Sequence, residues 1–203
     1  MPVIEFWYEF ASTYSYLAAM RVQDVAADEG IEIAWRPFLL GPIFKANGWE
    51  TSPFNLYPAK GRYMVRDIER QAAARGLRFA LPQPFPANGL HAARIATAGI
   101  AAGWCPAFTR AVFSAQFAGG ADISQIETLR VLLADIGTDP DAAIEASQSP
   151  EVKEDLRRHT AWAQEIGVFG APSFVTADGE IFWGDDRLEQ AVVWAKREIV
   201  LYP

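Results

Sequence analysis

The sequence predicts an α/β fold in which a block of helices interrupts a small mixed β-sheet. Segments rich in β-branched and aromatic residues occur near the two ends of the chain, whereas alanine-rich segments with helical periodicity fill its middle. The opening segments follow one another as strand, helix and strand, at a length that fits a βαβ unit with two parallel strands. The chain has 203 residues, 51% of them hydrophobic, which suffices for a buried core and excludes a disordered or fibrous protein.

The first strand and the first helix meet at Ser12. Residues 3–10 read VIEFWYEF, a run of β-branched and aromatic side chains that predicts a strand with at least one buried face. After Ser12, apolar residues recur at helical spacing until Gly30 supplies a C-terminal stop. Residues 31–38 again predict a strand, so Ser12 lies at the turn that opens the helix of the βαβ unit.

The middle of the chain predicts a loop followed by a series of helices. Residues 41–62 are dense in glycine, proline and asparagine without a sustained period, which predicts a long ordered loop or a lid. Residues 81–89 predict a second irregular connection. Helices are expected at 63–76, 90–103, 106–118, 124–136, 139–147 and 150–166. We identify four N-terminal caps for them: Asp122, Ser124, Thr138 and Ser149.

Strands return near the end of the chain. Residues 173–177 and 180–183 predict two strands, and the pair Asp178-Gly179 between them predicts a hairpin turn. A last helix is expected over 188–200, with apolar residues on one stripe.

The complete order of elements, βαβ, helices and ββα, is that of a thioredoxin-like domain with an inserted α-helical domain. We place the thioredoxin-like domain at residues 1–38 and 168–203. The inserted helical domain then covers residues 39–167 and includes the lid-like loop 41–62.

Charge and cysteine content exclude several kinds of function. Eighteen basic and 25 acidic side chains give a net charge of −7, which disfavours nucleic acid and anionic lipid as partners. The sequence has no apolar window long enough for a membrane span and no export signal near Met1, which predicts a soluble cytoplasmic protein. The single cysteine, Cys105, excludes a CxxC redox pair, and with His91 and His159 it forms no zinc-site pattern, so we expect no metal.

Ser12 occupies the position where thioredoxin-like redox proteins carry the first cysteine of a CxxC pair. The segment here reads Ser12-Thr13-Tyr14-Ser15, so hydroxyls replace both sulfur atoms and disulfide exchange is lost. The unpaired N–H groups at the start of the helix still favour an anion, such as a thiolate that a ligand supplies. The alternative is that Ser12 is an ordinary N-cap.

Pro172 provides the second signal, because a proline stands just before a predicted strand in the segment 167–174. In thioredoxin-like folds the equivalent proline is cis and lies against the active turn. The backbone of the preceding residue, Ala171, can then pair with a bound peptide as an added strand. The alternative is that Pro172 only begins an edge strand.

Four separated motifs resemble one family of enzymes. They are FASTYSYL at 10–17, PAKGRY at 58–63, GVFGAP at 167–172 and FWGDDRL at 182–188. Together they resemble the 2-hydroxychromene-2-carboxylate isomerases and the related kappa-class glutathione transferases, over essentially the whole chain. The resemblance implies a DsbA-like thioredoxin fold, a homodimer and glutathione as the cofactor.

The resemblance also implies roles for individual residues. Ser12 matches the catalytic serine that contacts the glutathione sulfur, and Ala171 with cis-Pro172 matches the segment that holds the cysteinyl backbone. Asp185 and Asp186 match the positions that bind the γ-glutamyl end, where an ammonium group requires a carboxylate. The alternative is that Asp185 caps the last helix and Asp186 is an acid of its first turn.

A further group of residues is expected to contact the substrate. Lys60 and Tyr63 lie on one side of a helix start, where Lys60 could neutralise a carboxylate of glutathione or of the substrate. Tyr14, Trp49 and Asn55 complete the expected acceptor site. Other aromatic residues that could join this pocket are Trp7, Phe54 and Tyr57. The alternatives are a solvated helix face for Lys60 and core packing for the aromatic residues.

The chain departs from the family pattern at two positions. Thr13 stands where the family has proline, which reduces rigidity at the first helical turn more than it changes chemistry. Trp49 follows Gly48 where kappa-class enzymes carry asparagine, in a longer loop. We therefore favour the isomerase branch over the transferase branch.

The sequence thus predicts a glutathione-dependent isomerase that acts on 2-hydroxychromene-2-carboxylate or a similar aromatic carboxylate from aromatic-compound catabolism. The expected reaction is reversible addition of the thiolate, rotation about a bond and elimination. The alternatives are a kappa-like glutathione transferase or peroxidase, and a non-catalytic module that binds thiol peptides.

Overall fold

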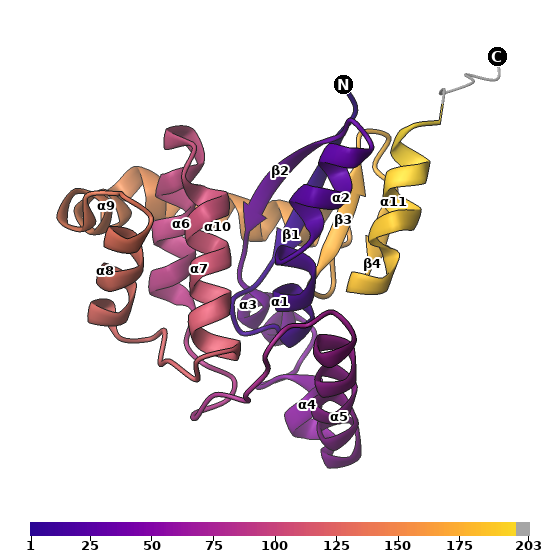
Figure 1. Cartoon of the computed structure of the whole chain (residues 1–203), viewed down its shortest axis with the longest axis horizontal. Coiled ribbons are helices and arrows are strands. Elements are labelled where there is room, and N and C mark those ends of the chain that lie inside the picture. The colour runs from indigo at the N-terminus through magenta and orange to yellow at the C-terminus, as the bar shows by residue number, and fades with distance from the viewer. Residues whose placement is uncertain (198–203) are drawn as a thin grey trace.

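A mixed sheet of four strands forms the centre of the molecule. The computed structural model describes residues 1–197. The strands are β1 (Val3–Tyr8), β2 (Glu32–Pro37), β3 (Ser173–Thr176) and β4 (Ile181–Trp183), in the order β2-β1-β3-β4. β1 is parallel to β2 and antiparallel to β3, and β3 is antiparallel to β4 (Figure 1). The predicted α/β fold, the βαβ unit and the hairpin at Asp178-Gly179 are confirmed.

Side chains alternate along β1 and supply a core on each face of the sheet. Ile4, Phe6 and Tyr8 are fully buried in the larger core. Trp7 points the other way into a smaller core with Phe38 and Val175. Strands with both faces covered read as nearly continuous apolar runs, which is the pattern of residues 3–10.

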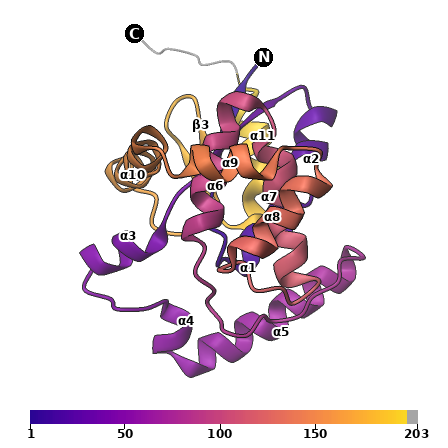
Figure 2. The same ribbon diagram turned by 90° about the vertical axis from the view of Figure 1, so that its left-hand side faces the viewer.

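The helices lie around this sheet and extend to one side of it (Figures 1 and 2). The two helices of the βαβ crossover are α1 (Thr13–Ala19) and α2 (Val22–Asp28). The next three are α3 (Leu40–Ala46), α4 (Pro53–Leu56) and α5 (Pro58–Ala74). The helical block consists of α6 (Leu90–Ala102), α7 (Cys105–Phe117), α8 (Ile126–Asp135), α9 (Pro140–Ser147) and α10 (Pro150–Glu165). The short 3-10 helix η1 (Asp185–Arg187) leads into α11 (Leu188–Ala195).

The first predicted helix is in fact two helices. It breaks between α1 and α2 at Arg21, a position that no glycine or proline marks. The side chain of Arg21 is held there by ion pairs with Asp185 and Glu189. A tertiary contact therefore overrides the helical pattern of the sequence.

The predicted lid-like loop 41–62 is wrong in its secondary structure. The segment folds as α3, α4 and the first turn of α5, which starts at Pro58 instead of residue 63. Pro58 is well suited to a first helical position because its missing N–H would have no partner there. Gly61 allows α5 to approach α4, because a Cβ atom at Gly61 would lie 2.6 Å from the carbonyl oxygen of Phe54. Tight packing of two helices therefore accounts for Gly61, whereas Gly48 lies at a φ of 78° in the turn after α3.

The helix caps are partly as expected. Ser149 caps α10 by accepting the N–H of Val152, as predicted. Asp139, not Thr138, caps α9. Asp122 and Ser124 do not cap α8, because the Asp122 carboxylate accepts the N–H of Ser124 in the turn before it. At the other end of the chain, α11 ends at Ala195, and residues 198–200 of the predicted last helix lie outside the described residues.

Candidate active site

A cleft of about 1260 Å³ opens between the end of β1 and the helices α3 to α5. The turn that carries Ser12 forms one wall, and residues of α3, α4 and α5 form another. Figure 2 shows these three helices along the lower edge of the molecule. The segments 85–87, 169–172 and 183–187 complete the lining. The cleft therefore joins residues that follow β1, residues next to β3 and β4, and residues of α3 to α5.

Ser12 lies at the N-terminus of α1 and faces cis-Pro172. Its hydroxyl oxygen accepts the N–H of Ser15 at 3.1 Å, so Ser12 is the N-cap of α1. The same hydroxyl donates to the carbonyl oxygen of Ala171 at 2.9 Å. The Ser12 hydroxyl therefore caps α1 and contacts the residue before Pro172 at the same time.

The hydroxyls that follow Ser12 differ in their surroundings, because Thr13 and Tyr14 line the cleft and Ser15 does not. Thr13 is buried, and its Oγ1 lies 3.2 Å from the sulfur of Met64. Ser15 is completely buried, and its Oγ has no hydrogen-bond partner among the described residues. Of the two serines in this segment, Ser12 is therefore the one that lines the cleft.

The peptide bond between Ala171 and Pro172 is cis, as expected for this fold. Both residues line the cleft. On the far side of the proline, its carbonyl oxygen accepts the N–H of Gly184 at 2.9 Å, which ties this turn to the segment that carries Asp185 and Asp186. The edge beside Ala171 faces the cleft, where an extended peptide would lie.

Asp185 and Asp186 are neighbours with different surroundings. The Asp185 side chain is only 1% exposed, and its carboxylate accepts from Arg21 Nε at 3.0 Å and from Arg75 Nη2 at 2.6 Å. The Asp186 side chain is 67% exposed and pairs with Arg187 at 3.1 Å. Both residues line the cleft, but the carboxylate of Asp185 is already neutralised by two guanidinium groups. Asp186 is thus the more accessible of the two carboxylates, and the expected contacts of both aspartates with glutathione stay predictions.

One side of α5 supplies polar groups to the cleft. Tyr14 donates from its hydroxyl to Asp67 Oδ2 at 3.0 Å, and Gln71 donates to the same oxygen at 2.7 Å. Burial, and then the hydrogen bond to Asp67, raise the pKa of Tyr14 above its ordinary value, so Tyr14 is a neutral donor here. Lys60 and Tyr63 line the cleft and are exposed.

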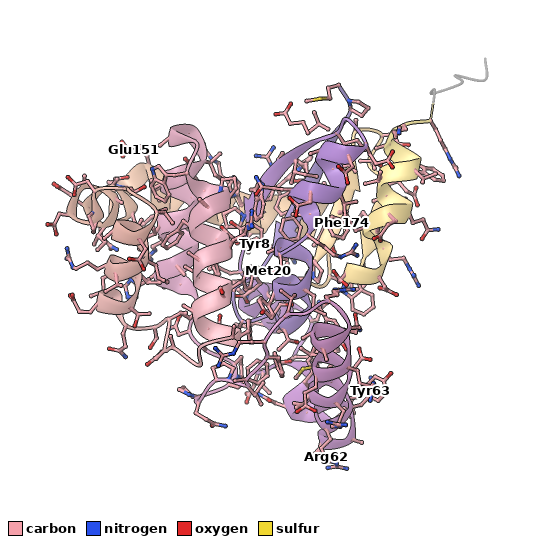
Figure 3. The ribbon with its side chains drawn as sticks, viewed as in Figure 1. Tyr8, Met20, Arg62, Tyr63, Glu151 and Phe174 are labelled. Atoms are coloured by element: carbon pink, nitrogen blue, oxygen red, sulfur yellow. The ribbon has the colours of Figure 1, made fainter. Side chains whose placement is uncertain are left out.

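Figure 3 shows Tyr63 on α5, away from the helical block. The ammonium group of Lys60 lies 5.0 Å from the centre of the Tyr57 ring.

The aromatic border of the cleft differs in part from the expected one. Trp49, 40% exposed, packs beside Phe44 with 5.9 Å between ring centres, and Phe54 also lines the cleft. Asn55 is exposed on α4 and is not among the lining residues, although its amide donates to Thr51, which does line the cleft. The contact of Asn55 with the substrate stays a prediction.

Two of the other aromatic candidates also fall outside the site. Trp7 is fully buried in the smaller core, and Tyr57 does not line the cleft.

The structure adds site residues that the sequence did not indicate. Phe169 and Trp183 face each other across the rim with 4.9 Å between ring centres. Phe85 lines another part of the wall. Glu9 lies at the end of β1, where a polar residue closing an apolar strand was the available signal. Among residues 1–197 we find no cluster of metal-binding side chains, and none of their helices has the length and apolar character to span a bilayer.

Comparisons with known proteins agree with this geometry. Residues 3–192 match the family model described as DSBA-like thioredoxin domain. The chain is 32% identical over 188 residues to a 2-hydroxychromene-2-carboxylate isomerase of Sphingobium xenophagum, covering 92% of this chain and 94% of that protein. It is 26% identical to glutathione S-transferase kappa 2 of Caenorhabditis elegans, covering 93% and 89%.

A solved structure of 2-hydroxychromene-2-carboxylate isomerase shares the fold. Its TM-score is 0.83 at 26% identity, and the alignment covers 93% of this chain and 91% of that one. The fold class and the family resemblance predicted from the sequence are therefore confirmed.

Proposed function

Because this chain belongs to the DSBA-like thioredoxin domain family, and within it to the 2-hydroxychromene-2-carboxylate isomerase family, we propose that it is a glutathione-dependent isomerase. Its substrate would be 2-hydroxychromene-2-carboxylate or a similar aromatic carboxylate. The observation that carries the proposal is the contact between the Ser12 hydroxyl and the carbonyl of Ala171, beside cis-Pro172.

The residues of the cleft fit glutathione. The backbone of Ala171 can receive the cysteinyl residue of an extended tripeptide, which places the sulfur beside Ser12. The exposed carboxylate of Asp186 can pair with the α-ammonium of the γ-glutamyl end. A volume of about 1260 Å³ leaves room for a second molecule next to the tripeptide.

When bound, glutathione would supply a thiolate that adds reversibly to an electrophilic carbon, which frees a neighbouring bond to rotate, and it would be released unchanged. Ser12 would change its hydrogen bond on binding. The cysteinyl N–H would donate to the Ala171 carbonyl, and the Ser12 hydroxyl, now free of that carbonyl, would donate to the sulfur. Lys60 would neutralise the substrate carboxylate.

Most of the free energy needed to lower the thiol pKa of bound glutathione would come from the hydrogen bond of Ser12. Lowering a thiol pKa from about 8.5 to about 6.5 requires roughly 2.7 kcal/mol of preference for the anion. A hydrogen bond to a charged group contributes about 1.5 to 3 kcal/mol. The start of α1 adds at most about 2 kcal/mol, and this helix has only seven residues. The hydroxyl and the helix start together meet the requirement.

The test replaces Ser12 by alanine and uses Ser15→Ala as the matched control. With Ser12→Ala we expect turnover of chromene carboxylate to fall by a factor of roughly 100 to 1000. The pKa of bound glutathione, followed by the ultraviolet absorbance of the thiolate, should rise. Ser15→Ala should change neither, because the Ser15 hydroxyl is buried without a partner. Equal turnover in Ser12→Ala and the wild type would refute the assignment.

The second candidate is a kappa-like glutathione transferase or peroxidase, which the similarity to glutathione S-transferase kappa 2 supports. Product analysis separates the two, because an isomerase returns free glutathione whereas a transferase keeps it conjugated. A non-catalytic module would bind glutathione and turn over no electrophile.

The homodimer and the cytoplasmic location stay predictions. Sedimentation of the purified chain would test the homodimer.

A further inference from the structure

Glu9 is an acidic residue in the cleft that the proposed mechanism does not yet use. It follows β1 directly and stands three residues before Ser12. Glu9 lines the same cleft as Ser12 and Pro172 and is only partly exposed. Its Oε1 accepts the N–H of Ala11 at 3.3 Å. The turn that positions Ser12 thus also fixes the Glu9 carboxyl group.

The surroundings of Glu9 favour its protonated form. Its hydrogen bonds come from backbone groups of Ala11, Leu40 and Phe10, and among residues 1–197 no cation pairs with it. Burial raises the pKa of Glu9, and the backbone hydrogen bonds offset this only in part. The ionisable side chains that share the cleft are Tyr14 on α1, Glu50 before α4, Lys60, Tyr63 and Asp67 on α5, and Asp185, Asp186 and Arg187 on η1.

We propose that Glu9 is a catalytic acid and base of the isomerisation, acting on the oxygen of the bound electrophile. This inference rests on the proposed function and adds to it the residue that moves the proton. Its basis is geometric: one rigid turn presents a carboxyl group and the Ser12 hydroxyl to a single cleft.

The proton transfer is balanced over one cycle. When a thiolate adds to a C=C carbon conjugated with a carbonyl group, a C–S bond would form, the C=C electron pair would become the double bond of an enol, and the C=O π pair would move to the oxygen. The O–H bond of Glu9 breaks, and an O–H bond forms at that oxygen. In the elimination the proton would return to the Glu9 carboxylate, the carbonyl and C=C double bonds would re-form, and the C–S bond would break with its electron pair leaving on the thiolate. Nothing is oxidised or reduced, and Glu9 ends in its starting form.

The alternative is that Glu9 only holds the turn together through its hydrogen bonds to backbone groups. Glu9→Gln separates the two roles, because glutamine keeps the shape and an acceptor oxygen but cannot exchange this proton. Glu50→Gln is the matched control, since Glu50 also lines the cleft but is exposed. Glu9→Asp keeps the acid and moves it by one methylene group.

We expect Glu9→Gln to lower kcat by roughly 100-fold, within the range for loss of a general acid. Its glutathione affinity, measured by calorimetry, should stay within about threefold of the wild type. The wild-type kcat should decrease as pH rises through the pKa of Glu9, and this limb should be missing in Glu9→Gln. Glu50→Gln should behave as the wild type, and Glu9→Asp should recover part of the activity together with the pH limb.

A second measurement does not depend on turnover. In wild-type protein labelled with ¹³C at the glutamate carboxyl carbons, the Glu9 resonance, assigned from Glu9→Asp, should titrate above the ordinary pKa of about 4.3. Titration at or below that value would overturn the inference. So would an active wild type with an equally active Glu9→Gln, which would leave the proposed function intact. A wild type that isomerises no chromene carboxylate would instead overturn the proposed function, and this inference with it.

Discussion

Asp185 is a buried charge in the wall of the cleft that pairs with two arginines from other elements. Its carboxylate joins Arg21, at the break between α1 and α2, to Arg75, just after α5. This places the turn of η1, and with it Asp186, at a fixed position beside the Ala171 segment. Because both arginine side chains keep some exposure, at 19% and 29%, the pairs are partly screened by solvent.

Replacing each aspartate by asparagine should separate stability from binding. Asp185→Asn leaves two guanidinium groups without their carboxylate, and we expect the free energy of unfolding to fall by about 2 to 3 kcal/mol. Asp186→Asn should leave it within about 0.5 kcal/mol, because that side chain is mostly exposed, and should weaken glutathione binding about tenfold. Urea unfolding and calorimetry measure the two quantities. The interpretation fails if Asp186→Asn is the less stable variant.

At the scale of elements, the sequence predicted what local patterns determine. The βαβ unit, the hairpin with Gly179 at a φ of 86° and the helices of the block all depend on periodicity and turn residues, and they are found. No glycine or proline marks the break at Arg21, and inside 41–62 Pro58 was a local signal for a helix start that the high glycine and proline content obscured.

The same distinction applies to the candidate site. Ser12 and Pro172 follow from their places in the fold, and the structure brings them together. Asp185 pairs with Arg75 and Arg21, which precede it by 110 and 164 residues in the sequence. Sequence spacing alone could not connect these three residues. Glu9 was missed for a similar reason, because the burial that sets it apart is a property of the assembled cleft.

The packing of α4 against α5 can be tested at Gly61. Alanine has the better helix propensity, by up to about 1 kcal/mol. We nevertheless expect Gly61→Ala to lower the free energy of unfolding. A Cβ atom there would press on the Phe54 carbonyl, displace α4 and raise KM for the electrophile several-fold. The control is Ala73→Gly at an exposed position of α5, which should cost about 1 kcal/mol and leave KM unchanged. A stabilised Gly61→Ala with normal KM would contradict this packing.

Across the whole molecule, the helical block and the sheet share one hydrophobic core. The Phe10 ring, from the turn after β1, lies 5.1 Å from that of Phe113 on α7, and the Tyr8 ring lies 6.0 Å from Phe113. Tyr8 also contacts Thr109 through a 2.7 Å hydrogen bond. The division into residues 1–38 with 168–203 and residues 39–167 stays a prediction, and this continuous core argues that the two parts unfold together.

A histidine on the other face of the sheet provides a pH test of the packing between the helical block and the sheet. His159 on α10 lies 3.2 Å from the Pro37 carbonyl, and burial lowers its pKa in the folded protein although that carbonyl raises it. Of the charged groups nearby, Arg36 lowers this pKa further, whereas Asp155 and Glu5 raise it.

The unfolded chain therefore binds more protons than the folded one between the folded pKa and about 6.5, so stability should fall as pH decreases through that window. The slope should reach at most about 1.4 kcal/mol per pH unit.

His159→Gln should flatten this slope, because glutamine can still donate to the Pro37 carbonyl but does not titrate in this range. The measurement is the free energy of unfolding in urea at several pH values between about 4.5 and 7.5. The comparison concerns slopes, so a uniform loss of stability in the variant does not affect it. Identical slopes in both proteins would assign the pH dependence to other groups.

The lone cysteine has a practical consequence for experiments that add glutathione to the protein. Cys105 is 1% exposed, and burial raises its pKa to about 11. A thiol in this state is almost entirely protonated at neutral pH and out of reach of reagents. We therefore expect oxidised glutathione to form no mixed disulfide with the folded protein, and alkylating probes added together with glutathione to react with the glutathione sulfur alone.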